Sequence, residues 1–182
     1  MRKLDEKETP DFYILGPQKT GTSSIFASLS EHPELCGSSK KEPHFFDKSF
    51  NFHRGPKWYY KFFENCKGLK FEATPNYFTS PLARVRMKAM GIGKSKTAKF
   101  VLFLRDPVDR FVSHYCHFRR YNEIIVGDPI ALGEFIKGKS PKSFNPNWRG
   151  EPRSLKEVLL KMNREHLIAC GEYIANLKHW HA

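Results

Sequence analysis

The sequence lacks the features that identify membrane-spanning, secreted and metal-binding proteins. No apolar run approaches the length of about 20 residues that spans a bilayer, and the first ten residues are polar and charged, unlike a signal peptide. No cysteine pair has the C-x-x-C spacing, and no group of His, Cys, Asp or Glu has the spacing of metal ligands. These absences predict a soluble chain with no membrane segment and no bound metal.

Cysteine is scarce, and its four positions are far apart: Cys36, Cys66, Cys116 and Cys170. We expect buried free thiols at these positions. A disulfide is left open, because sequence spacing alone does not decide which cysteines meet.

Acidic residues are few relative to basic ones. The chain has 31 Lys and Arg against 19 Asp and Glu, a formal net charge of +12 over 182 residues. Such an excess favours an anionic partner: nucleic acid, an anionic polysaccharide, a phosphate-bearing cofactor or an acidic membrane surface. An apolar content of 40% with 14% aromatic residues excludes a disordered chain and predicts one globular domain over residues 1–182.

The N-terminal part of the chain predicts a loop that binds an anion. Phe12–Leu15 indicates a short buried strand, the chain breaks at Gly16, and a helix pattern begins at Thr22. A strand, a glycine-bearing turn and a helix N-terminus together present free N–H groups and the positive end of the helix dipole to a ligand. Lys19 adds an ammonium group in the turn. A phosphate is the expected ligand, and a turn without a ligand is the alternative.

This loop differs from the nucleoside-triphosphate loop G-x-x-x-x-G-K-[ST], in which lysine follows the second glycine. Here Lys19 lies two residues before Gly21. A P-loop kinase or NTPase therefore remains only an alternative. It requires Mg²⁺ and an acidic residue at the end of a core strand, where this chain has Arg105.

Alternating strand and helix patterns predict an α/β fold: three layers, with a central parallel sheet flanked by helices. Strands are expected at residues 12–15, 70–74 and 100–104. The last is apolar throughout, so we expect it to be buried on both faces. Residues 122–152 are rich in Gly, Pro, Lys and Asn and predict an irregular loop, for which a substrate lid and plain disorder are both left open.

Polar residues follow each expected strand. Ligands of open α/β sheets bind beyond the carboxyl ends of the strands. Glu72 and Thr74 therefore join the anion loop as candidates at this edge, together with Arg105 and, further along the next helix, Ser113. The guanidinium of Arg105 suits a second phosphate, and a salt bridge to a neighbouring aspartate is the alternative.

Four segments form an ordered series of motifs: Gly16–Thr22, Lys41–Asp47, Glu72–Phe78 and Leu104–Tyr115. Together they resemble the sulfotransferases that use 3′-phosphoadenosine 5′-phosphosulfate (PAPS), particularly the heparan sulfate N- and 3-O-sulfotransferases. In order, they resemble that family's 5′-phosphosulfate loop, catalytic-glutamate segment, second-strand motif and 3′-phosphate motif. A weaker resemblance extends over residues 171–180. The resemblance implies the P-loop-like form of the α/β fold.

The resemblance also implies a role for individual residues. The 5′-phosphosulfate of PAPS would be held by the Lys19 ammonium and by the backbone at Thr20, Gly21, Thr22 and Ser23. The 3′-phosphate would be held by Arg105 and Ser113. Glu42 would be the general base and Lys19 its catalytic partner at the leaving phosphate. Three residues around the base would orient it or contact the acceptor: Lys41, His44 and Asp47. No metal is implied.

The implied reaction transfers a sulfuryl group to a hydroxyl or amine of a carbohydrate, most simply an anionic, heparan-sulfate-like glycan, with no nucleic-acid partner. A non-catalytic module that binds anionic polysaccharides is the alternative outside enzymes. Ala73 stands where these sulfotransferases have an active-site lysine, so the acceptor is less defined than the donor. Family members also continue beyond the residue equivalent to Trp180, which predicts that this chain is incomplete or a truncated, inactive homologue.

The resemblance gives two expectations for location. Members of this branch are often Golgi enzymes with an N-terminal membrane anchor. A Golgi location is expected if such an anchor precedes this chain, and a cytoplasmic one otherwise.

Overall fold

The computed structural model describes residues 8–92, 98–114, 116–117 and 171–181. The chain forms two compact units, one of residues 1–106 with 169–182 and one of residues 107–168. One domain over the whole chain stays a prediction. The expected loop at 122–152 lies outside the described residues.

The first unit is built on a parallel sheet of four strands, β1 (Phe12–Leu15), β2 (Leu35–Gly37), β3 (Leu69–Ala73) and β4 (Lys99–Leu102). Their order across the sheet is β2-β3-β1-β4, and each neighbouring pair is parallel. The predicted α/β fold is confirmed, and three of the strands lie where the apolar runs indicated. The sequence did not indicate β2, because it has three residues and no apolar run.

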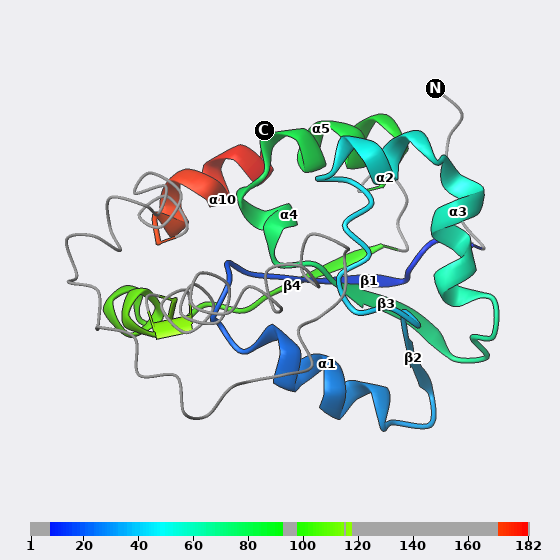
Figure 1. Ribbon diagram of the computed structural model, residues 1–182, viewed down its shortest axis with the longest axis horizontal. Helices are drawn as coiled ribbons and strands as arrows, with labels where there is room; N and C mark the ends of the chain where they lie inside the picture. Colours follow the sequence, from blue (N-terminus) through cyan, green and yellow to red (C-terminus); the bar gives the residue numbers. More distant parts are fainter. Residues whose placement is uncertain (1–7, 93–97, 115, 118–170, 182) are drawn as a thin grey trace, which may run out of the picture. The chain divides into compact units, whose positions relative to one another are not determined.

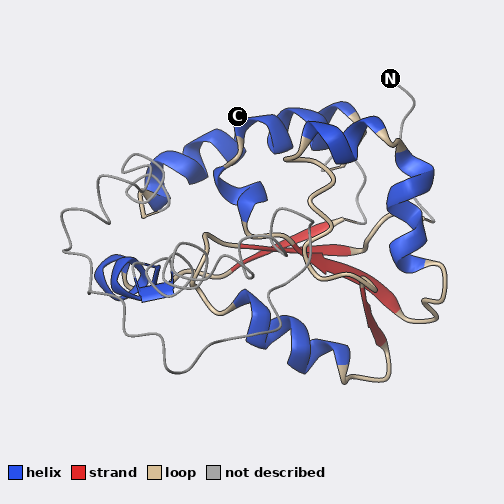
Figure 2. Ribbon diagram, in the orientation of Figure 1, coloured by secondary structure: helices blue, strands red, loops and turns tan. Residues whose placement is uncertain are grey.

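Helices cover both faces of this sheet (Figures 1 and 2). One face carries α1 (Thr22–Ser30), which packs Ile25, Phe26 and Leu29 near Phe71 of β3. The other carries α2 (Ser49–His53), α3 (Pro56–Tyr60), the 3₁₀ turn η1 (Lys61–Phe63), α4 (Asn76–Thr79), α5 (Pro81–Ala89) and α10 (Tyr173–His181).

Helix start signals in the sequence correspond to local hydrogen bonds. Ser80 caps α5 by accepting a hydrogen bond from the Ala83 amide at 3.2 Å, and Pro81 takes the first helical position. In the second unit, residues 107–114 are helical, and this helix begins at Pro107 directly after Asp106.

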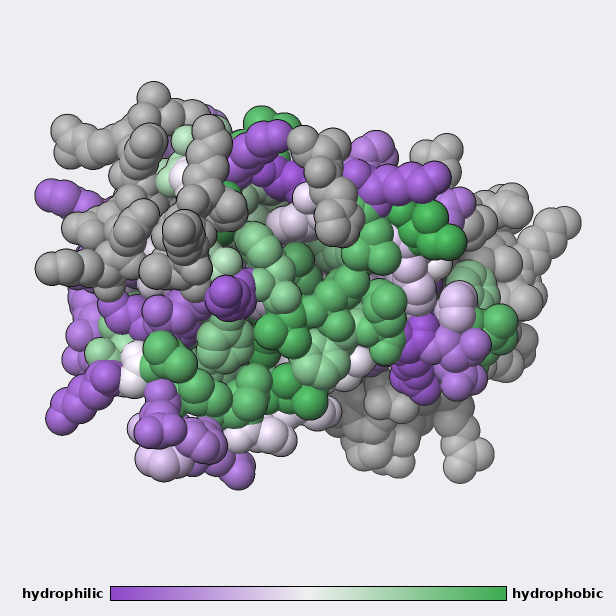
Figure 3. Space-filling model, turned by 180° about the vertical axis from the view of Figure 1, so that it is seen from behind, coloured by the Kyte–Doolittle hydropathy of each residue, from purple (hydrophilic) through white to green (hydrophobic). Residues whose placement is uncertain are grey.

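The last strand does not have the environment that its composition predicted. β4 lies at the edge of the described sheet, and Phe100 and Val101 are 39% and 41% exposed. Burial on both faces is therefore wrong for this strand. A broad apolar area is visible in the space-filling view from behind (Figure 3). An apolar run predicts a strand, but only the order of the strands decides how many neighbours it has.

The expectation of free buried thiols is also wrong for three of the four cysteines. Cys36, on β2, forms a disulfide with Cys66, 30 residues later, and their Cα atoms are 5.5 Å apart. The pairing of β2 with β3 brings the chain before β3 beside Cys36. Cys116 is free but exposed, and Cys170 lies outside the described residues.

Candidate active site

The loop Gly16–Thr22, here called the cradle, connects β1 to α1. Gly16 is required by a close approach, since a Cβ there would lie 2.5 Å from the Phe103 carbonyl oxygen. Lys19 and Gly21 both have positive φ, 74° and 94°. The Thr20 hydroxyl closes the turn by donating to the Pro17 carbonyl at 2.9 Å. The local sequence thus folds the loop back over itself before the helix begins.

The cradle suits an anion. Gly21 is the N-cap of α1 and has no side chain to satisfy the first-turn N–H groups. A Cβ at Gly21 would meet nothing within 4 Å, so the space beside these groups is open. Thr22 is buried and Ser23 is exposed. Positive charge is supplied by the helix dipole and by Lys19, which is half-buried.

Arg105 lies beside the cradle. Its Nη1 donates to the Lys19 carbonyl at 3.4 Å, and its own carbonyl accepts a 2.7 Å hydrogen bond from the Tyr173 hydroxyl on α10. Two residues predicted for the donor, 86 positions apart, are therefore brought together by parallel β1 and β4. Ser113, which was also predicted for the donor, is half-buried on helical residues 107–114 of the second unit.

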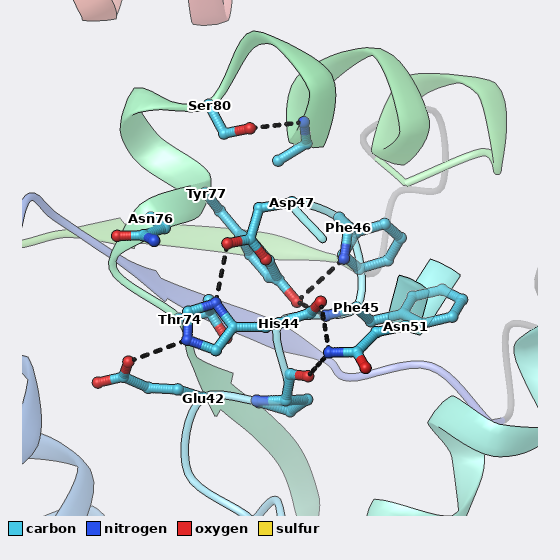
Figure 4. Close-up of polar contacts among 12 residues, drawn as sticks. Glu42, His44, Phe45, Phe46, Asp47, Asn51, Thr74, Asn76, Tyr77 and Ser80 are labelled. Atoms are coloured by element: carbon cyan, nitrogen blue, oxygen red, sulfur yellow. Dashed lines mark hydrogen bonds and ion pairs between the residues drawn. The ribbon is translucent and has the colours of Figure 1, made fainter. Parts of the chain in front are cut away.

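The residues Glu42–Asp47, here called the Glu42 loop, follow β2. His44 lies between two carboxylates: its Nε2 is 3.4 Å from Glu42 Oε2 and its Nδ1 is 2.8 Å from Asp47 Oδ2 (Figure 4). Lys41 Nζ contacts Glu42 Oε1. The predicted base and the three residues predicted around it are thus in one group.

Neighbouring charged side chains determine the protonation states of Glu42 and His44. Burial alone would raise the pKa of Glu42, but hydrogen bonds from His44 and Lys41 outweigh it and lower this pKa to about 2. Burial alone would lower the pKa of His44, but hydrogen bonds to Asp47 and Glu42 raise it to about 9. At neutral pH Glu42 is therefore a carboxylate and His44 an imidazolium.

The backbone of the Glu42 loop is strained. Glu42 and His44 have φ of 59° and 54°, and with Lys19 they are the non-glycine residues with positive φ in the described chain. Such conformations cost about 1–3 kcal/mol each and persist only where surrounding contacts enforce them. Strain therefore singles out three predicted site residues independently of any motif.

Contacts from three helices hold the Glu42 loop in place. Asn51 of α2 donates to the carbonyls of Pro43 at 3.1 Å and His44 at 3.2 Å (Figure 4). The Tyr77 hydroxyl of α4 accepts from the amides of Phe45 and Phe46, and Arg86 of α5 donates to the Phe46 carbonyl at 2.9 Å. The sequence indicated none of these three supporting residues, because no local pattern specifies contacts between positions 7 to 40 residues apart.

Glu72 and Thr74 do not line the edge as the strand end suggested. Both side chains are fully buried, and Glu72 accepts hydrogen bonds from Tyr59 and Thr74 within the aromatic core. Burial raises the pKa of the Glu72 carboxyl to about 7. The alternation of β3 gives the reason, since Glu72 pairs in register with buried Tyr13 and faces the same side of the sheet.

The described part of the chain forms neither a metal site nor a membrane-spanning helix. Among these residues, no group of three His, Cys, Asp or Glu side chains is placed to hold a metal ion. In the same described ranges, no helix is both long and apolar enough to cross a membrane.

Fold and site together define a class: an α/β protein with an anion cradle and a Glu–His–Asp group on loops after parallel strands. The family model "Sulfotransferase domain" matches residues 9–182, and the chain belongs to this family. The resemblance seen in the sequence is thereby confirmed.

Individual proteins similar to this chain are also sulfotransferases. The chain is 32% identical over 180 residues to human bifunctional heparan sulfate N-deacetylase/N-sulfotransferase 3, covering 94% of this chain but 18% of that protein. It is 38% identical over 111 residues to mouse heparan sulfate glucosamine 3-O-sulfotransferase 3B1, covering 60% and 27%. The crystal structure of a sulfotransferase from Alicyclobacillus acidocaldarius superposes with a TM-score of 0.58 at 27% identity, covering 94% of this chain and 68% of that one. The chain thus spans under a fifth of the length of the first relative.

Proposed function

We propose that this chain transfers a sulfuryl group from PAPS to a hydroxyl or amine of a carbohydrate. The observation that carries the proposal is topological. The cradle, the Glu42 loop and Arg105 follow the carboxyl ends of β1, β2 and β4, three strands of one parallel sheet. Ligands of open parallel sheets bind at this edge.

The donor's two anionic ends have matching partners. The N–H groups at the start of α1 and the Lys19 ammonium suit the 5′-phosphosulfate, and the guanidinium of Arg105 suits the 3′-phosphate, with Ser113 as its proposed second donor. Lys19 and the helix dipole act where negative charge grows on the leaving phosphate. Preorganised electrostatics of this kind usually lowers a reaction barrier more than any other single effect.

Glu42 is the proposed base. The acceptor oxygen or nitrogen bonds to sulfur, the bond from sulfur to the 5′-phosphate oxygen breaks, and Glu42 takes the acceptor's proton. Lys41 and His44 keep Glu42 ionised, which is the form a base requires. A carboxylate with so low a pKa is a weak base, so proton transfer follows bond formation to sulfur, when the acceptor proton has become acidic. His44 and Asp47 orient the carboxylate.

The acceptor is proposed to be anionic, as heparan sulfate is. The net charge of +12 favours such a ligand. The Cys36–Cys66 disulfide supports an oxidising compartment such as the Golgi lumen over the cytoplasm, where disulfides are rare.

Binding of adenosine 3′,5′-bisphosphate tests the donor site. At about 100 times its dissociation constant, this product should raise the melting temperature by roughly 5–10 °C. Arg105→Ala should abolish most of this shift, whereas Arg54→Ala, which removes an exposed arginine stacked on Phe50 and Trp58, should keep it. No shift in the unmutated chain would refute donor binding. A shift with ATP that needs Mg²⁺ would favour the kinase or NTPase alternative.

A further inference from the structure

Glu72 is a buried titratable group for which the proposed reaction has no use. It lies in β3 with no exposed surface, inside the aromatic cluster that also contains Tyr13, Tyr59 and Tyr77. A carboxyl group is costly to bury unless its oxygens are hydrogen-bonded. An apolar residue would fill a merely structural position at lower cost, so the hydrogen-bond partners of Glu72 indicate what the carboxylate does.

The partners of Glu72 lead to the Glu42 loop. Tyr59 donates to Oε1, while Thr74, at 3.1 Å, and Tyr77, at 3.4 Å, donate to Oε2. The Tyr77 oxygen in turn accepts from the amides of Phe45 at 2.9 Å and Phe46 at 3.4 Å (Figure 4). Tyr77 can accept from both amides while its single proton is directed to the Glu72 carboxylate.

The Glu42 loop needs such a support. Phe45 follows His44, and both His44 and Glu42 have positive φ. A strained loop keeps its conformation only while contacts outside it outweigh the strain. The amides that bond to Tyr77 lie one and two residues after His44. Through them, Tyr77 holds the strained segment at the point where the chain enters the core.

We propose that Tyr77 and Glu72 are positioning residues for catalysis: through the Phe45 and Phe46 amides, the Tyr77 hydroxyl holds Glu42 and His44 in their active arrangement, and Glu72 directs that hydroxyl. The inference rests on the proposed role of Glu42 as the base. Neither residue touches donor or acceptor.

Ionisation of Glu72 should change this support. An ionised carboxylate only accepts, whereas a protonated one can donate to the Tyr77 oxygen and compete with the two amides. The titratable groups that face Glu72 are Tyr59 from α3, Tyr77 from α4, Tyr13 from β1 and Asp47 from the Glu42 loop. The three tyrosines have raised pKa values because they are buried, so near pH 7 they stay neutral.

The first test is kinetic. Tyr77→Phe keeps the ring and removes the hydroxyl, and it should lower kcat about tenfold, the effect of losing one to two net hydrogen bonds. KM for the donor should change less than twofold, because the cradle is a separate loop. Tyr13→Phe is the matched control, since Tyr13 is equally buried and its hydroxyl bonds to no amide of the loop among the described residues. Equal losses in both variants would overturn the proposal.

Glu72→Gln is a second kinetic test of the same support, made at the carboxyl group that directs the Tyr77 hydroxyl. It replaces an accepting oxygen by a donating NH₂ and should also lower kcat about tenfold. The double variant with Tyr77→Phe should lose no more than either single variant, because both remove one support. In the unmutated chain kcat should rise through an ionisation near pH 7 that Glu72→Gln abolishes. Additive losses, or an unchanged pH profile, would contradict the proposal.

A third measurement separates this inference from the proposed function. The His44 imidazole can be titrated by NMR without any substrate. In Tyr77→Phe its pKa should fall clearly below about 9, because the two carboxylates no longer flank it as closely. An unchanged titration would overturn the positioning role. A chain that sulfates no glycan but shows this fall would refute the proposed function and retain the coupling of Tyr77 to His44.

Discussion

The cradle and the Glu42 loop both hold non-glycine residues at positive φ, yet they are supported differently. The cradle is closed by the hydrogen bond from Thr20 to the Pro17 carbonyl, three residues earlier. From outside it is contacted by Arg105 and by Asn76 of α4, which accepts a hydrogen bond from Gln18 at 3.2 Å. The Glu42 loop is held by side chains from α2, α4 and α5, at sequence separations from 7 to 40. The turn of the cradle is thus closed by a hydrogen bond within the loop, whereas the strained Glu42 loop is held by side chains of distant helices.

The loops also differ in charge. The cradle offers a helix dipole and an ammonium to an incoming anion. The carboxylates of the Glu42 loop already have cationic partners, because Lys41, directly before the loop, pairs with Glu42 and His44 pairs with both Glu42 and Asp47. The cradle is thus arranged to receive negative charge, and the Glu42 loop is arranged to keep one carboxylate ionised.

The largest expected effect is at Glu42. Glu42→Gln should lower turnover by roughly 10²–10⁴-fold, because a general base contributes about that much. Transfer of radiolabelled sulfonate to a panel of glycans measures the loss. The melting-temperature shift with adenosine 3′,5′-bisphosphate should survive, since the cradle is intact. Retained turnover would remove Glu42 as the base.

The next effect concerns the strand that leads into the Glu42 loop. Replacing Cys36 and Cys66 by serine should reduce the free energy of unfolding by about 3 kcal/mol, as expected for a loop of 30 residues. Urea unfolding measures the change. The control is Cys116→Ser, which removes a free exposed thiol and should alter stability by less than about 0.5 kcal/mol. Equal stability of the double-serine variant would contradict a structural disulfide.

The third prediction is a pH dependence. Burial raises the pKa of Glu72 from 4.5 to about 7, so the folded chain binds this proton more tightly than the unfolded chain does. Protonation of Glu72 therefore adds about 3 kcal/mol to the free energy of unfolding. This contribution is fully present below pH 4.5 and is lost as pH rises through 7. Relative to Glu72→Gln, the unmutated chain should lose stability over this range. Parallel stability curves for the two proteins would show that Glu72 titrates normally.

The smallest effect is expected in the cradle. Gly21→Ala places an L-residue at φ 94° and should cost about 1 kcal/mol of stability. Because the new methyl occupies the open space beside the first turn of α1, binding of adenosine 3′,5′-bisphosphate should weaken as well. The NMR signals of His44 should stay unchanged. A change at His44 would show that the two loops are coupled and break the contrast between them.

Several features could be predicted from sequence because their causes lie within a few residues. Phe12–Leu15, Gly16 and Thr22 specify a strand, a turn and a helix start, and each is where it was expected. Ser80 and Pro81 likewise mark the start of α5. The grouping of Lys41, Glu42, His44 and Asp47 followed from one short motif.

Other features could not be predicted, because they depend on which distant segments meet. Glu72 looked like an edge residue and is buried, since the register of β3 with β1 turns it toward Tyr13. Cys36 and Cys66 looked unpaired and form a disulfide. The apolar run of β4 looked central and lies at the edge of the described sheet.

The sequence by itself therefore determined the elements of this protein, the cradle and the identity of its charged groups, because backbone propensity and short motifs act locally. The tertiary structure alone decided which residues support the Glu42 loop and that the carboxyl group of Glu72 is buried with a raised pKa. Burial and hydrogen bonds between segments far apart in the chain set these properties, and no local pattern encodes them.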